Sequence, residues 1–347
     1  MKIATITFHW SVNYGAVLQA YALQKYLCTH GADAEIIDYV PRRVELSKFL
    51  LALKKRDRLF FKKRKLLHRF CKQELKLSKK NYRNNRALFQ CADHYDTVIC
   101  GSDQIWNESF TCGAEGKPTL SYYLNFAGKR TRRVAYAVSF GTLKLAQKTK
   151  DLILPQLKAF DRIAVREVSG QKILREMGVE SVVTLDPTML LPRQAYEELF
   201  SGREFSKAPK VFSYILHEGQ TTAQKVCHLV QRHFGQQVQD GGELYIDMRL
   251  WLHDLANAKF VVTNSFHGAV FAVLFHRPFA LLPVEKSGMN DRIQTLMNVL
   301  GLSDRIVTGE EDARAVLNSA IDWESVDARL KESREFSEQY LNEVIQA

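Results

Sequence analysis

The residues best suited to chemistry stand in four short groups, each at the C-terminal end of a predicted β-strand. Core packing does not require polar side chains there, and ligands of doubly wound sheets bind at the carboxyl ends of strands. The groups are His9 with Asn13-Tyr14-Gly15, residues 101–107 (Gly-Ser-Asp-Gln-Ile-Trp-Asn), Arg166, and residues 263–268 (Thr-Asn-Ser-Phe-His-Gly). Four such groups at the same edge of two predicted sheets indicate binding sites.

The group at 263–268 has the most suggestive chemistry. Asn264 or Ser265 can cap a helix that begins at Phe266, and Gly268 allows a close backbone approach to a ligand. The free N–H groups and the dipole of a helix start favour an anion. A bound phosphate dianion would favour the imidazolium form of His267, which a general acid needs. The alternative is that His267 only bonds a backbone carbonyl in this turn.

The other three groups also have simpler interpretations. In the 101–107 run, Ser102 or Asp103 can cap the next helix with Trp106 buried beside it. Residues 13–15 can form an ordinary turn and cap, and Arg166 can make an exposed ion pair of little energetic value. The sequence alone leaves these alternatives open.

The elements that must position these groups alternate between strand and helix, which predicts parallel βαβ units and the α/β fold class. In the first half we predict strands at 2–8, 35–39, 96–102, 133–141, 161–167 and 181–186, and helices at 15–27, 144–159 and 168–177. In the second half we predict strands at 210–216, 258–264 and 279–284, and helices at 221–234, 249–257, 266–275 and 290–300. The pattern predicts two Rossmann-like doubly wound domains with an active-site cleft between them.

The domain boundaries follow from the same pattern over the 347 residues. We predict an N-terminal domain over 1–191, a polar linker over 192–208 between Pro192 and Pro209, a C-terminal domain over 209–322 and a terminal helix over 323–347. The N-terminal domain carries a basic, amphipathic insertion at about 42–90.

Almost all of the net charge of +11 comes from that insertion, because residues 42–86 hold 18 Lys and Arg against 3 Asp and Glu. Apolar residues alternate with the basic ones at roughly helical spacing, which favours amphipathic helices on an anionic membrane surface. A solvated helical excursion and a nucleic-acid surface are the alternatives, although no nucleic-acid-binding motif accompanies the segment. We therefore predict a membrane partner and no nucleic acid.

Several classes of protein are disfavoured by what the chain lacks. No G-x-G-x-x-G or Walker A sequence is present, and no His/Cys spacing indicates a metal site. No segment reaches the ~18 uninterrupted apolar residues of a membrane span. The six cysteines include no C-x-x-C pair, as in proteins kept reduced in a cytosol. We expect a cytoplasmic protein, peripheral on the inner face of the cell membrane, without a metal or cofactor.

At the four groups, the chain resembles the polysaccharide pyruvyltransferase family. The matching strings are NYGAVLQAYALQ at 13–24, IIDY at 36–39, GSDQIWN at 101–107, AVRE at 164–167, DPT at 186–188, NSFHGAVFA at 264–272 and RPF at 277–279. They occur in order over about residues 1–300, and GSDQIWN and NSFHG are the most specific of them.

The resemblance implies a glycosyltransferase-B-like fold and transfer of pyruvate from phosphoenolpyruvate to a sugar, with release of phosphate. The expected product is a cyclic ketal on a cell-surface polysaccharide precursor carried by a polyprenyl diphosphate. By position, His267 corresponds to the catalytic histidine and Arg166 to the phosphoenolpyruvate-binding arginine. Lys286 is a further predicted contact, and Arg292 stands where the family often has lysine.

The chemistry of the residues agrees with this assignment. Phosphoenolpyruvate carries a carboxylate and a phosphate, which Arg166, Lys286, Arg292 and the helix start at Ser265, His267 and Gly268 can bind. His267 can protonate the methylene carbon, and Asp103 can take the proton of the attacking hydroxyl. For the acceptor we predict contacts with Asn13, Tyr14, Gly15, Ser102, Asp103, Gln104 and Trp106, with Tyr14 and Trp106 offering apolar faces to a sugar ring.

Two other functions remain compatible with the same residues. One is a sugar-nucleotide-dependent glycosyltransferase of the same two-domain architecture. The other is a non-catalytic protein that binds glycan precursors at the membrane. Release of phosphate from phosphoenolpyruvate on addition of an acceptor separates the first alternative from a pyruvyltransferase.

Overall fold

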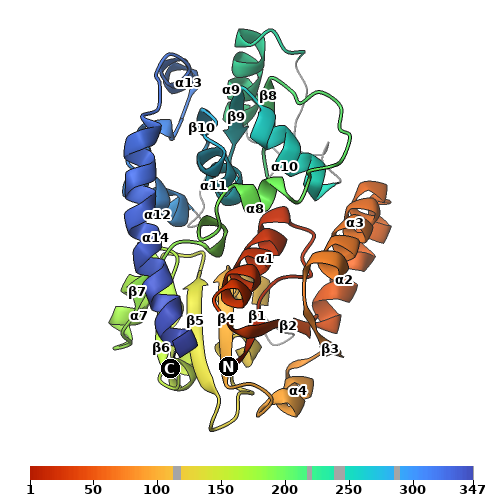
Figure 1. Cartoon of the computed structure of the whole chain (residues 1–347), viewed down its shortest axis with the longest axis vertical. Helices are drawn as coiled ribbons and strands as arrows, with labels where there is room; N and C mark the ends of the chain where they lie inside the picture. Colours follow the sequence, from red (N-terminus) through yellow and green to blue (C-terminus); the bar gives the residue numbers. More distant parts are fainter. Residues whose placement is uncertain (112–118, 217–220, 238–246, 285–289, 347) are drawn as a thin grey trace. The chain divides into compact units, whose positions relative to one another are not determined.

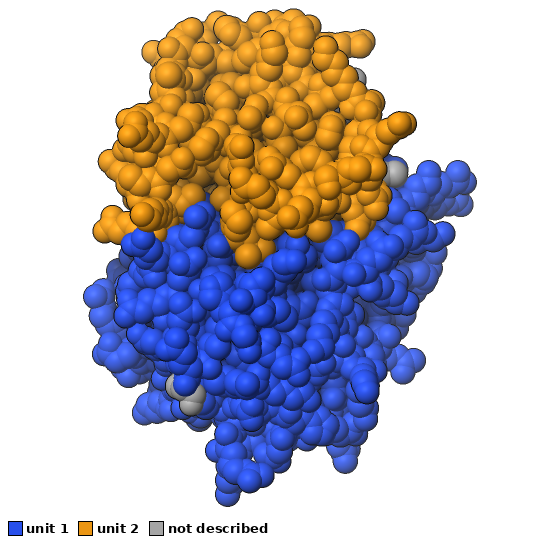
Figure 2. Space-filling view, in the orientation of Figure 1, with its two compact units in different colours: residues 1–190, 334–347 blue, residues 191–333 orange. Residues whose placement is uncertain are grey.

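The computed structural model describes residues 1–111, 119–216, 221–237, 247–284 and 290–346 (Figure 1). The chain forms two compact units (Figure 2): unit 1 contains Met1–Leu190 and Arg334–Ala347, and unit 2 contains Leu191–Ser333. The segment 192–208, which the sequence predicts to be a linker, is part of unit 2 and includes helix α8, Gln194–Glu197. The existence of an active-site cleft between the two domains stays a prediction.

Within the described residues, unit 1 is built on a seven-stranded parallel sheet with the strand order β3-β2-β1-β4-β5-β6-β7. The strands are β1 Lys2–Ile6, β2 Asp33–Tyr39, β3 Leu77–Tyr82, β4 Thr97–Asp103, β5 Arg132–Val138, β6 Arg162–Val165 and β7 Val182–Val183. The central strands are short, apolar and buried, as expected of a parallel sheet covered on both faces. Ile3 pairs with Ala34 on one side and Thr97 on the other, which fixes the register of the centre.

The helices of unit 1 connect these strands. They are α1 Tyr14–Thr29, α2 Arg42–Lys54, α3 Arg58–Glu74, α4 Asn85–Leu88, α5 Glu108–Thr111, α6 Gln147–Leu157 and α7 Val168–Glu176, with 3₁₀ turns η1 Phe89–Cys91, η2 Leu120–Tyr123 and η3 Pro187–Met189. Helix α1 packs against β2, β4 and α3 and is buried along most of its length. It therefore behaves as a core helix.

The basic segment contains helices, as its spacing of apolar and basic residues predicts, and also a strand that the sequence analysis does not predict. Helices α2 and α3 occupy most of it, but residues 77–82 form β3 at the edge of the sheet (Figure 1). Lys79 and Lys80 are exposed on this strand. Edge strands often carry charged side chains, because these prevent pairing with other chains. In the sequence, such a strand resembles the exposed face of a basic helix.

Within its described residues, unit 2 has a three-stranded parallel sheet, ordered β10-β9-β8, with β8 Val211–Tyr214, β9 Phe260–Thr263 and β10 Phe279–Leu281. Its further helical elements are α9 Thr221–His233, α10 Met248–Asn257, α11 Phe266–Leu274, α12 Asn290–Leu300, η4 Ser303–Arg305 and α13 Glu310–Leu317. Every residue of α11 is buried, so this apolar helix lies in the core.

The predicted terminal helix is present as α14, Trp323–Gln346. Its residues from Arg334 onward belong to unit 1. There Ser337 Oγ accepts a hydrogen bond from the Leu185 N–H at 3.0 Å, and Tyr340 donates one to the Ala135 carbonyl at 2.9 Å. Among the helices described, none has the length and hydropathy of a membrane span.

Candidate active-site residues

In unit 1, Arg166 lies at the centre of a buried ion-pair cluster. Its Nη1 donates to Asp186 Oδ2 at 2.7 Å, and its Nη2 lies 3.7 Å from Asp103 Oδ1. Burial lowers the pKa of Arg166, but the carboxylates of Asp186 and Asp103 raise it more, and the pKa is above its ordinary value. The guanidinium is therefore permanently charged and is held in place by two carboxylates.

Asp186 organises this cluster, a role that the sequence interpretation missed. Its Oδ2 accepts from Ser102 Oγ at 2.8 Å in addition to Arg166, and its Oδ1 accepts from the N–H and hydroxyl of Thr188 at 3.0 and 2.6 Å. A fully buried carboxylate requires such partners to offset its desolvation. The signal in the sequence is the Asp186-Pro187-Thr188 string, which begins at the last residue of the predicted strand 181–186.

Asp103 stands at the carboxyl end of β4 in a strained backbone conformation. Its φ is +74°, in the left-handed region that non-glycine residues seldom adopt. Its Oδ1 accepts from the Gln104 N–H at 2.8 Å, and its side chain is 14% exposed. Strain of this kind often occurs at functional sites. Asp103 therefore combines partial exposure, strain and contact with the buried arginine.

The neighbours of Asp103 are tied into the framework. Ser102 is buried and bonded to Asp186, and Gln104 accepts from the side-chain amide of Asn107 at 2.8 Å. Contact of Ser102 and Gln104 with an acceptor stays a prediction.

The prediction that Trp106 offers a face to a sugar ring is wrong. The indole is fully buried and stacks on Tyr123 with a centroid distance of 5.1 Å, while Phe140 and Phe160 cover its other sides. Its Nε1 donates to the Tyr122 carbonyl at 2.9 Å. Trp106 belongs to the core, where the apolar surface it buries stabilises the fold.

Residues 13–15 form the start of α1. Asn13 caps the helix by accepting from the Ala16 N–H, and Tyr14 and Gly15 lie buried in the first turn. The ammonium of Lys63, on α3, lies 3.9 Å from the centroid of the Tyr14 ring. One face of this ring is thus covered, and contact of residues 13–15 with an acceptor stays a prediction.

In unit 2, the turn between β9 and α11 is fixed by side-chain hydrogen bonds. Ser265 is the N-cap and its Oγ accepts from the Gly268 N–H at 3.3 Å. Asn264 does not cap the helix, because its side chain bonds both backbone groups of Leu216 beyond the end of β8. The turn is therefore anchored to the neighbouring strand.

Gly268 is required by packing. A Cβ at this position would lie 2.4 Å from Thr263 Oγ1, whose hydroxyl donates to the Tyr214 carbonyl at 2.7 Å. Helix α11 can approach β9 this closely only because residue 268 has no side chain. The close approach of a ligand to the backbone at Gly268 does not follow from this packing and stays a prediction.

His267 lies in the first turn of α11 and is 8% exposed. Its ring is perpendicular to that of Phe266, with centroids 5.1 Å apart, and the Arg292 guanidinium lies 5.7 Å from the Phe266 ring. The structure thus brings together Ser265, His267, Gly268 and Arg292. The fifth residue predicted for this group, Lys286, lies outside the described residues.

Two Rossmann-like α/β units with polar side chains at the carboxyl ends of parallel strands define a protein of the glycosyltransferase-B fold class, as the family resemblance implies. The chain belongs to the polysaccharide pyruvyl transferase family, whose sequence model matches residues 13–286. The family resemblance is thereby confirmed, and it assigns the chain a pyruvyltransferase activity in polysaccharide biosynthesis. No curated protein matches the sequence.

Solved structures share the fold at low sequence identity. The UDP-N-acetylglucosamine 2-epimerase from Rickettsia bellii is similar with a TM-score of 0.57 and 8% identity, covering 100% of this chain and 96% of that one. The MnaA protein of S. aureus, solved with UDP, is similar with a TM-score of 0.51 and 11% identity, covering 95% of this chain and 90% of that one. At such identities the likeness establishes the fold alone.

Proposed function

We propose that the protein transfers pyruvate from phosphoenolpyruvate to two hydroxyls of a sugar in a polysaccharide precursor, forming a cyclic ketal and releasing phosphate. Membership of the family supports the pyruvyl transfer. The observation that carries the residue assignment is the turn at β9–α11, because it fixes His267 in the first turn of a buried helix.

Donor binding follows from charge. Phosphoenolpyruvate presents a carboxylate and a phosphate, and the start of α11 offers backbone N–H groups and the positive end of a helix dipole. Arg292 adds a guanidinium 5.7 Å from the centroid of the Phe266 ring. Arg166 is the further proposed donor contact, with its planar fork held by Asp186 and Asp103.

His267 acts in this proposal as the general acid. It delivers a proton to the methylene carbon, which leaves cationic character at the central carbon for attack by the first hydroxyl. The C–O bond to phosphate then breaks, phosphate leaves, and the second hydroxyl closes the ketal. Of the two hydroxyl protons lost, one returns to the acid and one leaves with phosphate. Asp103, partly exposed at the end of β4, is the proposed acceptor of a hydroxyl proton.

The reaction can be tested with a panel of saccharides, some free and some linked to a polyprenyl diphosphate. We expect phosphate release from phosphoenolpyruvate that depends on a saccharide, together with a product whose mass gain matches pyruvate minus water. Turnover of a UDP-sugar with no phosphate released from phosphoenolpyruvate would contradict the proposal and favour a glycosyltransferase.

We also propose that α2 and α3 hold the protein at an anionic membrane surface, where a lipid-linked acceptor is found. Helix α2 exposes Leu46, Leu50 and Leu53, at a spacing that places them along one side, and Leu51 and Leu59 are exposed nearby. Exposed leucines beside basic side chains suit the boundary between lipid headgroups and acyl chains. The proposal rests on these exposed residues and on the local charge.

Vesicle co-sedimentation tests this surface. Replacing exposed Lys54, Lys55, Arg58 and Lys62 with Gln removes four charges, and each basic residue near an anionic surface contributes about 1 kcal/mol. We expect strong loss of binding to phosphatidylserine vesicles. The matched control replaces exposed Lys129, Lys148, Lys158 and Lys172 with Gln and should bind like wild type. If wild type ignores these vesicles at low salt, or if the control loses binding equally, the membrane proposal fails.

A further inference from the structure

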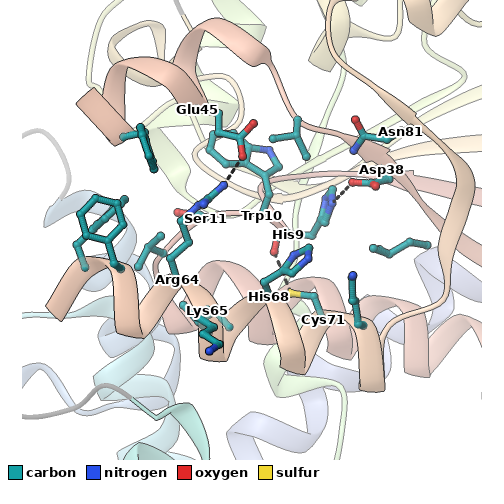
Figure 3. Close-up of a pocket in the computed structure, with 18 of the residues that line it drawn as sticks. His9, Trp10, Ser11, Asp38, Glu45, Arg64, Lys65, His68, Cys71 and Asn81 are labelled. Carbon is teal, nitrogen blue, oxygen red and sulfur yellow. Dashed lines mark hydrogen bonds and ion pairs between the residues drawn. The ribbon is translucent and has the colours of Figure 1, made fainter. Parts of the chain in front are cut away.

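Unit 1 contains a cavity of about 400 Å³ to which the reaction proposed above assigns no role, although His9, from the first of the four predicted groups, lies in its wall (Figure 3). This volume falls within the range of small-molecule sites, roughly 300–1,000 Å³. Its walls come from the loop after β1, the ends of β2 and β3, and helices α2 and α3. The ends of β1, β2 and β3 lie at the same edge of the sheet as Asp103 and Arg166, which is the edge where such sheets bind ligands.

The floor of the cavity is a fixed polar group. His9 Nε2 lies 3.1 Å from Asp38 Oδ1 (Figure 3). Burial raises the pKa of Asp38, but the hydrogen bonds from His9 and Asn81 and the charge of Arg83 outweigh it, and the pKa is lowered. Asp38 is therefore an ionised acceptor, and His9 donates to it.

His9 is also held from the α3 side. The thiol of Cys71 donates to the His9 carbonyl at 3.4 Å. Burial and the charge of Asp38 raise the pKa of this thiol to about 12, so that it stays protonated at neutral pH. The floor is consequently rigid before any ligand arrives, which lowers the entropic cost of binding.

Asn81 leaves an unused acceptor in the wall. Its side chain bonds Asp38, while its buried Oδ1 has no hydrogen-bond partner within the part of the chain that the structure describes. Buried polar atoms normally have partners, and an exception in a cavity wall indicates a group that arrives from outside. Asp38 and Asn81 together present oxygen acceptors, which suit ligand hydroxyls.

Part of the lining is aromatic. Phe61 contacts Phe49 and Phe60 edge to face, with centroid distances of 5.4 and 5.6 Å, and Trp10 also lines the cavity. Such rings bury the apolar face of a ligand, and the carbon–hydrogen face of a pyranose is of this kind. A cavity that holds both hydroxyl acceptors and aromatic rings therefore matches a sugar.

Positive charge exceeds negative charge around the cavity. Glu45 is bonded by Arg64 and by Arg83, the latter at 2.6 Å. Lys65 and Lys72 also line the cavity. They lie seven residues apart on the same face of α3, and neither has an ion pair among the described residues. His68 adds no charge at neutral pH, because burial and the charges of Lys72 and Arg64 lower its pKa. Two ammonium groups thus remain for a ligand anion.

We propose that this cavity binds the saccharide acceptor and that this saccharide carries a negatively charged group, either a carboxylate or a phosphate. The sugar ring packs against the aromatic wall, its hydroxyls bond Asp38 and Asn81, and its anion lies between Lys65 and Lys72. The identification of this saccharide as the acceptor rests on the function proposed above. The binding of an anionic saccharide in the cavity does not depend on that function.

Binding to the full chain, measured calorimetrically, tests the proposal without any enzyme assay. The probes are glucuronic acid, glucose 1-phosphate, glucose and inorganic phosphate. At least one charged sugar should bind about tenfold more tightly than glucose or better, since hydrogen bonds to charged groups are stronger than those between neutral groups. The tighter of the two charged sugars identifies carboxylate or phosphate as the preferred group.

Matched variants locate the site. Lys65→Gln with Lys72→Gln should weaken the binding of the charged sugar by about tenfold or more and leave the binding of glucose unchanged. Lys62→Gln with Arg69→Gln removes the same charge at the same spacing on α3, from exposed residues that do not line the cavity, and should have no effect. Asn81→Ala should weaken the binding of every sugar, including glucose.

Three results would overturn the proposal: charged sugars that bind no better than glucose, inorganic phosphate that binds as tightly as glucose 1-phosphate, or equal losses in both lysine variants. Binding without phosphate release from phosphoenolpyruvate would instead keep the site and refute the proposed function. Turnover of phosphoenolpyruvate by a chain that binds none of the sugars would keep the proposed function and refute the proposed site.

Discussion

The carboxyl edges of the two sheets are built differently. In unit 1, the residues that follow β4 and β6 form an ion-pair cluster in which Arg166 is held by Asp186 and faces Asp103. In unit 2, the residues that follow β9 form a helix start in which Ser265 caps α11 and His267 occupies the first turn. In unit 1, carboxylates balance the positive charge of Arg166. In unit 2, the start of α11 offers backbone N–H groups, with the Arg292 guanidinium nearby.

This difference indicates a division of labour. An edge with carboxylates suits hydroxyl groups that must lose a proton, and a helix start suits a phosphate or carboxylate. In the proposed function, Asp103 of unit 1 takes the hydroxyl proton and His267 of unit 2 protonates the donor, while Arg166 of unit 1 is a further donor contact. The predictions below test the two edges separately, in order of expected effect.

The largest effect on stability should come from Asp186→Ala, because it leaves Arg166 as a buried charge without its nearest carboxylate. Removing one partner of a buried ion pair costs about 3–5 kcal/mol. We expect thermal and urea unfolding to show a loss of this size. Asp151→Ala, at an exposed site in α6, should cost little. If both variants unfold alike, the cluster does not hold the edge of unit 1.

A smaller loss is expected from Gly268→Ala in unit 2. The added methyl meets Thr263 Oγ1, and overpacking of a core costs about 1–3 kcal/mol. Thr263→Ala removes the obstacle, so the double variant should be more stable than the sum of the two single changes predicts. Additive losses, measured by urea unfolding, would show that Gly268 is not needed for contact between α11 and β9.

The smallest effect concerns Lys63, which packs over Tyr14 beside the unit 1 edge. Burial lowers the pKa of Lys63 to about 8 from 10.5. Between these values the unfolded chain binds a proton that the folded chain has released, so the free energy of unfolding should rise with pH through this window. The attraction of the ammonium for the Tyr14 ring acts in the opposite direction.

Lys63→Met removes this titration. Compared with wild type, the variant should show a smaller rise in the free energy of unfolding between pH 7.5 and pH 9.5, and at pH 7 it should melt a few degrees higher. Lys62→Met, at a neighbouring exposed site, serves as the control. Parallel pH profiles for Lys63→Met and wild type would show that Lys63 is not buried in the folded chain.

Periodicity predicted most of the fold, because apolar β-branched runs and helical spacing report burial directly. The strand β3 was missed since Lys79 and Lys80 at an exposed edge look like a helix surface. Trp106 was misassigned because an aromatic residue after a strand is equally suited to stacking on a sugar or on Tyr123. Only tertiary contacts separate those two interpretations.

The sequence predicts the local conformation around single candidate residues better than it predicts which residues contact one another. Helix-start chemistry predicts Asn264 or Ser265 as the cap of a helix from Phe266, and in the structure Ser265 is the N-cap and His267 lies in the first turn of α11. Nothing local indicated that Asp186 bonds both Ser102 and Arg166, because partners 84 and 20 residues away leave no periodic signal. The cavity beside α3 was missed for the same reason, since its walls come from five separate elements.

The central claim, that the unit 2 edge activates phosphoenolpyruvate through His267, is tested most directly by His267→Gln. The measurement is phosphate release from phosphoenolpyruvate with a saccharide that wild type converts, alongside His233→Gln at an exposed site in α9 as the control. The account predicts a fall in kcat of ~10²–10⁴ for His267→Gln, with unchanged melting temperature and little change for the control. A His267→Gln variant that turns over at close to the wild-type rate would contradict it.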